Sequence, residues 1–443
     1  MNSSRTLACL TSIMLIIPGI SLANPGDYDN EGHGKGKKAR EAAVNEQFDA
    51  LDQRLLAIEF GLRSYVAINC NDDANALQNA TLSDNTTYTL SGMCNGPVWI
   101  DNHRDLTLQG DTTGSKDDGV MLPPGLLVNP VGAVRITRSS AIKLENLRLS
   151  ALNYVGQPYL FDAAVAGLSA GARSFVEATE VDVIGGDFAV DISNGSQLAL
   201  HQGVTVTDYN RAGLSAYNHA LIITHAPVTV SGIVGTSTET YPYAISAIGN
   251  SIVEINDGGS FSGASGKPVD EYPTAVWSGD NSTIHFGDGS HPTTVNGSIE
   301  SAYSSMVRIS GNLTLNGAMA AYHRGYIRAT GTAQSGGPIY AGDAATIRFE
   351  SSNLTPPNAD FPYATIDVYR QGNFRMNDTM VDLGGNTLYV SGFGIINLRG
   401  ASNLGGADIS CHDPNQISIR NEVTGVGPIS CMAPPPPFPP IVQ

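Results

Sequence analysis

The sequence has few charged residues, few cysteines and no long apolar run after its N-terminus. Only 15% of its 443 residues are charged, whereas 49 are glycine. This composition is not that of a helical enzyme and suits short strands joined by tight turns. Because no later segment is apolar for long enough to cross a bilayer, no transmembrane segment is expected. The net charge of −17 argues against general nucleic-acid binding, which needs a basic face.

The N-terminus has the pattern of a secretory signal peptide, predicted over residues 1–23. Arg5 provides the positive charge, residues 7–20 a mostly apolar stretch, and residues 21–23 a small-residue cleavage site. We therefore expect bacterial-type export to the periplasm, the cell surface or the medium. Residues 24–38 are polar and rich in glycine, which is typical of a flexible leader.

Four cysteines remain after the predicted signal peptide: Cys70, Cys94, Cys411 and Cys431. An even number in an exported chain favours disulfides, although four cysteines allow three pairings. Pairing within each end of the chain is the expected arrangement. It closes loops of about 20 residues, each worth roughly 3 kcal/mol. The wide spacing, without a C-x-x-C pattern, argues against a metal site.

Residues 39–66 carry the strong helical pattern of the chain. Apolar side chains recur there at alternating spacings of four and three, which is a heptad seam: Val44, Phe48, Leu51, Leu55, Ile58, Leu62 and Tyr65. One interpretation is an amphipathic helix that caps the following domain, which the off-seam Leu56 and Phe60 favour. The other is a coiled coil that forms a homotrimer.

From residue 67 to residue 431 the pattern changes to repeated short strands. Segments that align by hydrophobic alternation contain a short strand, a polar turn and a second strand: 215–223, 246–255, 301–309, 320–329, 338–349 and 367–376. A pentapeptide such as "LTLNG" (313–317) follows most of them. Repeats of this size without helices predict an all-β solenoid, a parallel β-helix. In it the apolar residues of the pentapeptide point inward, threonine points outward, and glycine turns the corner.

The N-terminal end of this region carries a family resemblance. The segment "INCNDDANALQNATLSDNTTYTLSGMCNGPVWIDNHRDLTLQG" (68–110) contains a short Ala/Leu helix at 76–80, a strand ending in "SGMC" and an "LTLQG" strand. It resembles the start of secreted bacterial right-handed β-helix proteins of the pectate-lyase-like superfamily. The resemblance implies a right-handed parallel β-helix over roughly residues 68–431. It leaves the activity open, because the superfamily holds lyases, hydrolases, epimerases, adhesins and tailspikes. Residues 432–443 predict an extended Pro-rich tail.

One outward position of the aligned repeats is basic, although the chain is acidic. Successive repeats place there Glu254, His285, Arg308, Arg328, Arg348 and Arg375. The preceding turn carries Tyr303, Tyr322, Tyr340 and Tyr369. Aromatic faces stack on sugar rings, and arginines form bidentate pairs with carboxylate or sulfate. We therefore predict binding of an extracellular anionic polysaccharide by six residues: Tyr303, Arg308, Tyr340, Arg348, Tyr369 and Arg375.

The alternative is structural. Each arginine would pair with a neighbouring acid such as Glu300, Glu350 or Asp367, and the tyrosines would only cover the coils. The corresponding second hypothesis for function is a non-enzymatic trimeric surface or fibre protein.

The chain contains no complete catalytic motif. If it is an enzyme, the residue types of a polysaccharide lyase occur together in "YHRGYIR" (322–328), where the candidates are Tyr322, His323, Arg324 and Arg328. A lyase needs a cation beside the uronate carboxylate and an acid and base such as tyrosine and histidine. A glycoside hydrolase is the other reaction class. No cofactor is expected, although scattered aspartates are suitable ligands for Ca²⁺.

Overall fold

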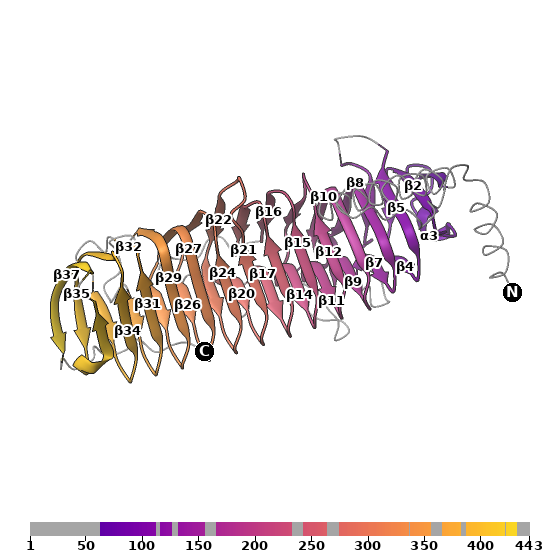
Figure 1. Ribbon diagram of the computed structural model, residues 1–443. Helices are drawn as coiled ribbons and strands as arrows, with labels where there is room; N and C mark the ends of the chain where they lie inside the picture. Colours follow the sequence, from indigo (N-terminus) through magenta and orange to yellow (C-terminus); the bar gives the residue numbers. More distant parts are fainter. Residues whose placement is uncertain are drawn as a thin grey trace, which may run out of the picture. The chain divides into compact units, whose positions relative to one another are not determined.

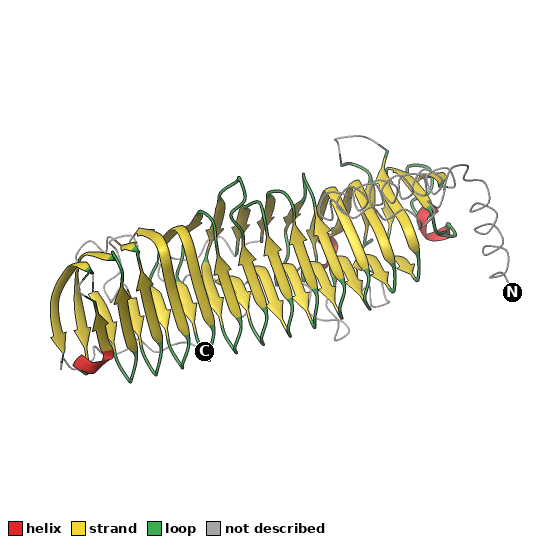
Figure 2. Cartoon of the chain, in the orientation of Figure 1, coloured by secondary structure: helices red, strands yellow, loops and turns green. Residues whose placement is uncertain are grey.

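The protein is all-β in the residues that its structure, a computed structural model, describes (Figures 1 and 2). Those residues are 63–111, 116–125, 132–155, 165–232, 242–263, 274–335, 337–355, 366–381, 387–420 and 422–431. Their strands pair in parallel, and each coil of the chain lies on the preceding coil (Figure 1). The predicted all-β, β-helix-like architecture is confirmed to this extent. The signal peptide, the leader, residues 39–62 of the heptad segment and the Pro-rich tail lie outside the described residues.

Three strands make up one coil, and each strand pairs with its counterpart in the next coil. In the middle of the chain β14 pairs with β17, β15 with β18 and β16 with β19. The strands therefore form three rows, numbered here so that row 1 leads into row 2 and row 2 into row 3.

Row 1 contains β4 (Val98–Asp101), β7 (Gly132–Thr137), β9 (Ala166–Gly171), β11 (Phe188–Ser193), β14 (Ala212–Tyr217), β17 (Tyr243–Ile248), β20 (Thr274–Ser278), β23 (Ser298–Ser301), β26 (Met319–Ala321), β28 (Ile339–Ala341), β30 (Ile366–Val368), β33 (Thr387–Val390), the end of β35 (Asn403–Cys411) and β37 (Thr424–Cys431). Row 2 contains β1 (Ser64–Asn69), β2 (Thr86–Ser91), β5 (Arg104–Gly110), β12 (Gln197–Leu200), β15 (Leu221–Thr224), β18 (Ile252–Ile255), β21 (Thr283–Phe286), β24 (Met306–Ile309), β31 (Asn373–Asn377), β34 (Ile395–Arg399) and β36 (Ile417–Ile419). Row 3 contains β3 (Met93–Asn95), β6 (Gly119–Met121), β13 (Thr205–Thr207), β16 (Val228–Ser231), β19 (Gly259–Ser262), β22 (Thr293–Asn296), β25 (Leu313–Leu315) and β32 (Met380–Val381). Four long strands bend from row 2 into row 3: β8 (Ser140–Ala151), β10 (Phe175–Gly185), β27 (Tyr326–Ser335) and β29 (Thr346–Thr355).

The core lies between the rows, and the strand period of two decides which side chains enter it. In β24, for example, Val307 and Ile309 are buried while Arg308 between them is exposed. Aromatic side chains of neighbouring coils pack against one another in the core, as Phe349 and Phe374 do with ring centroids 5.9 Å apart and ring planes tilted by 52°. Alternation along each strand thus fixes which residues are available on the outside.

The pentapeptides occupy two rows. Those at 88–92 and 106–110 lie in β2 and β5 of row 2, and those at 228–232, 293–297 and 313–317 in row 3. Their apolar residues are buried, as predicted. Glycine has two roles. Gly297 has a left-handed φ of 126°, as expected at a corner, whereas a Cβ at Gly317 would lie 2.3 Å from the Gly297 carbonyl oxygen. At Gly317 the close approach of the preceding coil therefore excludes a side chain.

The turn from row 1 to row 2 repeats one unusual backbone conformation. Both of its residues have a left-handed φ in successive coils, for example 53° at Tyr303 and 63° at Ser304. The turns are hydrogen-bonded to one another: Ser304 N donates to His323 O at 3.2 Å, and Arg324 N donates to Asp343 O at 3.1 Å. This ladder holds the strained backbone and stacks the side chains of consecutive turns above one another.

Buried serines satisfy backbone groups beside these turns. The Ser251 hydroxyl donates to Ile248 O at 2.8 Å and accepts from Ala220 N at 3.2 Å, while Ser251 N donates to Ser282 Oγ at 3.0 Å. Because Ser251 and Ser282 are buried, their hydroxyl groups make the hydrogen bonds that solvent would otherwise make to these backbone groups.

Replacing Ser251 with alanine is expected to lower the free energy of unfolding by about 1–2 kcal/mol, because it leaves the buried Ala220 N–H without a partner. Urea unfolding followed by circular dichroism measures the change. Ser304→Ala is the matched control, since Ala344 fills the equivalent turn position two coils later. Equal effects of the two substitutions would contradict the role of the buried hydroxyl.

The N-terminal coil corrects one boundary. Residues 64–66, the end of the predicted heptad segment, form part of β1, and Tyr65 lies opposite Thr87 of β2. A β-branched residue at Val66 and six residues of pairing to β2 favour the strand there. The short Ala/Leu helix is present as α3 (Ala76–Asn79), and two 3-10 turns follow later, η1 (Leu152–Tyr154) and η2 (Pro414–Gln416).

Both predicted disulfides are present. Cys70 bonds to Cys94 with their Cα atoms 5.0 Å apart. Cys411 bonds to Cys431, its direct partner in the register of β35 and β37. Each disulfide therefore ties together neighbouring segments at one end of the coil stack. The described part of the chain contains no helix that combines the length and the hydropathy of a membrane span.

Candidate functional site

The strand register confirms the predicted alignment of the arginines. Arg308 of β24 lies opposite Arg328 of β27, which lies opposite Arg348 of β29, which lies opposite Arg375 of β31. These four residues, called the arginine column, project from the outer face of row 2 at a coil spacing of about 4.8 Å. His285 and then Glu254 continue the same line toward the N-terminus, also as predicted.

One carboxylate compensates the two central arginines. Glu350 lies two residues after Arg348 on the same face of β29 and forms ion pairs with Arg328 and Arg348. Arg328 Nε donates to Glu350 Oε2 at 2.7 Å. Both arginine side chains remain 39% exposed, so solvent and a ligand can still reach them. The structural alternative, pairing with a neighbouring acid, is therefore correct for these two arginines.

The outer members of the column differ. Arg308 is exposed, and Arg375 donates from Nε to the Asn373 side chain at 3.1 Å. Within the described residues neither one forms an ion pair. Burial and the charge of Arg308 lower the pKa of His285, which favours the neutral form of this neighbouring imidazole. The column therefore carries four positive charges against one carboxylate.

The four tyrosines do not form the single column that was predicted. Tyr303 is a turn residue whose counterpart in the next coil is His323, whereas Tyr322 and Tyr369 lie one position before the turn. Tyr340 lies in row 1, opposite Asp367 of β30. Aligning Tyr303 with Tyr322 shifts the repeat by one residue, and such a shift sends a strand side chain to the other face.

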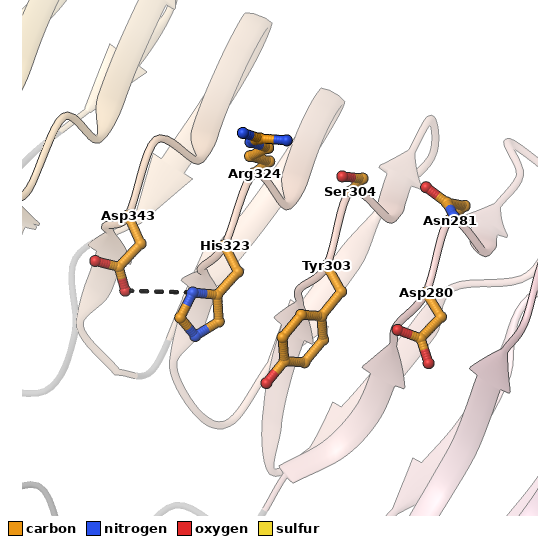
Figure 3. Close-up of a pocket in the computed structure, with 7 residues that line it drawn as sticks. All are labelled: Asp280, Asn281, Tyr303, Ser304, His323, Arg324 and Asp343. Carbon is orange, nitrogen blue, oxygen red and sulfur yellow. Dashed lines mark ion pairs between the residues drawn. The ribbon is translucent and has the colours of Figure 1, made fainter.

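The stacked turns form a shallow groove of about 460 Å³, called the corner groove, lined by Asp280, Asn281, Tyr303, Ser304, His323, Arg324 and Asp343 (Figure 3). In Figure 3 the first residues of the turns point to one side and the second residues to the other. The rings of Tyr303 and His323 stack with centroids 5.0 Å apart. His323 Nδ1 lies 3.7 Å from Asp343 Oδ2, and Arg370 Nη1 lies 3.7 Å from Asp343 Oδ1. The groove thus joins a flat aromatic surface to ionic groups.

The predicted catalytic residues are not brought together. His323 and Arg324 point to opposite sides of their turn (Figure 3), and Arg328 is bound by Glu350 in row 2. The hydroxyl of Tyr322 is buried near Glu300, and both the burial and the charge of Glu300 raise its pKa. These residues therefore do not converge on one point, as the acid, base and cation of a lyase must.

The outer face of row 1 holds carboxyl groups that were not predicted to form a site. The central residues of successive row-1 strands lie opposite one another in one line, the row-1 column: Asp191, Ser215, Ser246, Trp277, Glu300, Ala320, Tyr340, Asp367 and Tyr389. Burial raises the pKa of Asp191 and of Asp367 to about 6, and it also raises that of Glu300. Asp191 and Asp367 each stand between two apolar residues of a short strand, whereas Glu300 is followed by Ser301. The pentapeptides and the arginines lie in rows 2 and 3, so neither pattern marks this line.

The described ranges contain no group of three or more His, Cys, Asp or Glu side chains that could hold a metal ion. No protein-family model matches the chain, and no curated protein matches it. Function must therefore follow from the chemistry of the surfaces themselves.

Proposed function

We propose that this protein is exported and binds an extended anionic polysaccharide along the arginine column and the adjoining corner groove. Part of the proposal is that the fold is a right-handed parallel β-helix of the pectate-lyase-like superfamily, which the segment 68–110 supports. The signal-peptide pattern at residues 1–23 supports export. The observation that carries the proposal is the in-register column of four arginines on a chain with a net charge of −17.

Regular spacing makes the column suitable for a polymer. A linear polysaccharide with an acidic group on each sugar presents its charges periodically, as the column presents guanidinium groups. Each guanidinium can form a bidentate pair with a carboxylate or sulfate. At the neighbouring corner the stacked Tyr303 and His323 offer a flat surface for a sugar ring. Because the arginines are solvent-accessible, binding is expected to weaken as salt rises.

Arg308→Ala is expected to reduce the affinity for polygalacturonate or alginate about tenfold at low salt, which corresponds to roughly 1.4 kcal/mol. Arg308 has no carboxylate partner among the described ion pairs, so its loss removes binding charge without freeing an acid. Arg138→Ala is the control: it removes the same charge from an exposed arginine, paired with Asp101, far from the column. Affinity electrophoresis measures both. Equal losses for the two variants would contradict the site.

Glu350→Gln is expected to change affinity in the opposite direction. It keeps the shape of the side chain but removes the charge that compensates Arg328 and Arg348. Binding of polygalacturonate should tighten several-fold, and more so at low salt. An unchanged affinity would show that the centre of the column does not contact the polymer.

Incubating the protein with polygalacturonate or alginate also tests for catalysis. Elimination within a uronic-acid polymer creates an unsaturated sugar that absorbs ultraviolet light, so absorbance during incubation reports lyase turnover. If the polymer binds and no unsaturated product forms, the protein binds the polysaccharide without cleaving it by elimination.

Sedimentation equilibrium of the mature chain tests the homotrimer that the heptad pattern of residues 39–66 predicts.

A further inference from the structure

Basic residues continue on the outer face of row 2 beyond the arginine column, toward the C-terminal end of the coil stack (Figure 1). In the two coils after Arg375 the column position holds Asn397 and Ser418, which are uncharged. The next outward position, two residues further along each strand, holds Arg399 and Arg420 in the same coils. The line of guanidinium groups therefore does not end at Arg375 but moves sideways toward row 3.

Arg399 and Arg420 are neighbours in consecutive coils. Leu398 of β34 pairs with Ile419 of β36, and Arg420 N donates to Leu398 O at 3.2 Å, so Arg420 comes next to Arg399 in the register. Leu398 is buried, so the alternation along the strand turns Arg399 outward. Both arginines are exposed, as Arg375 is. Arg375, Arg399 and Arg420 are called the C-terminal arginine cluster.

The acid that compensates the centre of the arginine column has no counterpart in this cluster. Glu350 lies opposite Asn377 of the next coil, and Asn377 lies opposite Arg399. Successive coils thus change this position from an acid to an amide and then to a base. The neighbouring Asp378 instead accepts from Ala401 N at 3.0 Å and from Asn377 Nδ2 at 2.8 Å. Among the residues that the structure describes, no arginine of the cluster forms an ion pair.

The same local motif orients two arginines of the cluster. Arg375 Nε donates to Asn373 Oδ1 at 3.1 Å, and Arg399 Nε donates to Asn397 Oδ1 at 2.9 Å. In each coil the asparagine stands two residues before the arginine and therefore on the same face of the strand. Because these bonds use Nε, they leave the two terminal nitrogens of each guanidinium for an anion. A carboxylate or sulfate can bind there through two parallel hydrogen bonds.

We propose that the C-terminal arginine cluster is the strongest anion-binding part of this face and that the acidic polysaccharide, after following the arginine column to Arg375, crosses toward row 3 onto Arg399 and Arg420. The inference rests on the proposed function for the class of polymer. From Arg308 to Arg420 the guanidinium groups cover six coils, about 24 Å at the coil spacing. An open face is sufficient, because exposed cations attract the acidic groups of a polymer without a cavity.

Isothermal titration of the full mature chain with oligogalacturonates of three and of ten sugars tests the proposal. Arg399→Ala is expected to weaken the binding of both oligomers about fivefold or more, because it removes the central charge of the cluster. Arg308→Ala should weaken the binding of the ten-sugar oligomer alone. Three sugars bound at the cluster do not reach Arg308, which lies three coils before Arg375.

Asn397→Ala separates the orientation of Arg399 from its charge. It removes the acceptor of the Arg399 Nε–H but keeps every charge, so affinity should fall about twofold while its dependence on salt stays that of the wild type. Arg399→Ala should reduce that salt dependence as well. Arg173→Ala is the matched control, because it removes an exposed arginine from a turn near the N-terminal end. It should leave both affinities unchanged.

The proposal is overturned if Arg399→Ala, folded as shown by circular dichroism, binds the ten-sugar oligomer as tightly as the wild type. Dependence on Arg308 alone would give that result and leave the proposed function intact. Dependence on Arg399 without any on Arg308 would support the cluster and contradict the column. The proposal is equally overturned if the three-sugar oligomer does not bind at millimolar concentration, or if Arg173→Ala weakens binding as much as Arg399→Ala.

Discussion

Replacing Phe374 with alanine is expected to lower the free energy of unfolding by about 3–5 kcal/mol. The Phe374 side chain is fully buried on the inner face of β31, and its ring packs against Phe349 in the preceding coil. Alanine removes most of that apolar contact and leaves a cavity, because a strand held by ladders on both sides relaxes only partly. Urea denaturation followed by circular dichroism gives the change.

Phe393→Ala separates the effect of burial from that of removing an aromatic ring. Phe393 is 80% exposed in a turn of the following coil, so its replacement should change stability by less than about 0.5 kcal/mol. A large loss for Phe374 also has a functional consequence, since this residue supports the strand that carries Arg375. Similar small changes for both variants would show that the stability of the core does not depend on the packing of Phe374 against Phe349.

Asp191→Asn is expected to stabilise the protein by about 3 kcal/mol at pH 8 and to have no effect near pH 4. Burial raises the pKa of Asp191 to about 6, above the ordinary value near 4. Between these values the folded state holds a proton that the unfolded state has released, so stability falls as pH rises through this window. Above about pH 6 the Asp191 carboxylate is charged in the folded state as well, and its burial lowers the free energy of unfolding by the full amount. Asparagine resembles the neutral acid, which is why the gain should appear only at high pH.

Asp101→Asn should show the reverse dependence. Hydrogen bonds from Arg138 and Thr137 lower the pKa of Asp101 to about 2, so its carboxylate stabilises the folded state above about pH 4. That contribution is lost as pH falls toward 2, and asparagine lacks it throughout. Unfolding curves from pH 3 to pH 8 compare the two variants. If Asp191→Asn had the same effect at pH 4 and pH 8, its carboxyl group would not be buried as a charge.

The arginines and the tyrosines differ in how well the sequence pattern predicts their alignment. The arginines were aligned correctly because Val307, Ile327, Ile347 and Phe374 mark the inward position directly before each of them, and the strand period of two leaves one register. The tyrosines adjoin a turn, where the period of two no longer applies. The sequence pattern therefore predicts Tyr322 as the counterpart of Tyr303, whereas the counterpart in the structure is His323.

The row-1 column depends on still more distant information. Its members follow the same coil spacing as the arginine column, but they differ in residue type, so no repeated side chain marks their line in the sequence. Burial of their outward side chains is also not encoded by alternation, which predicts exposure for that face. The shared use of Glu350 by two arginines is a further tertiary result, because it depends on one coil lying directly on the next.

The sequence by itself determined the parallel all-β class, the disulfide partners and the arginine column, because each follows from local periodicity or from pairing near one end of the chain. Only the tertiary structure decided which tyrosines share a face, which arginines are compensated and which acids are desolvated. These depend on contacts between coils, and the register of such contacts is set by the path of each turn and the length of each insertion. A single residue at a turn changes that register and, with it, the surface on which a side chain lies.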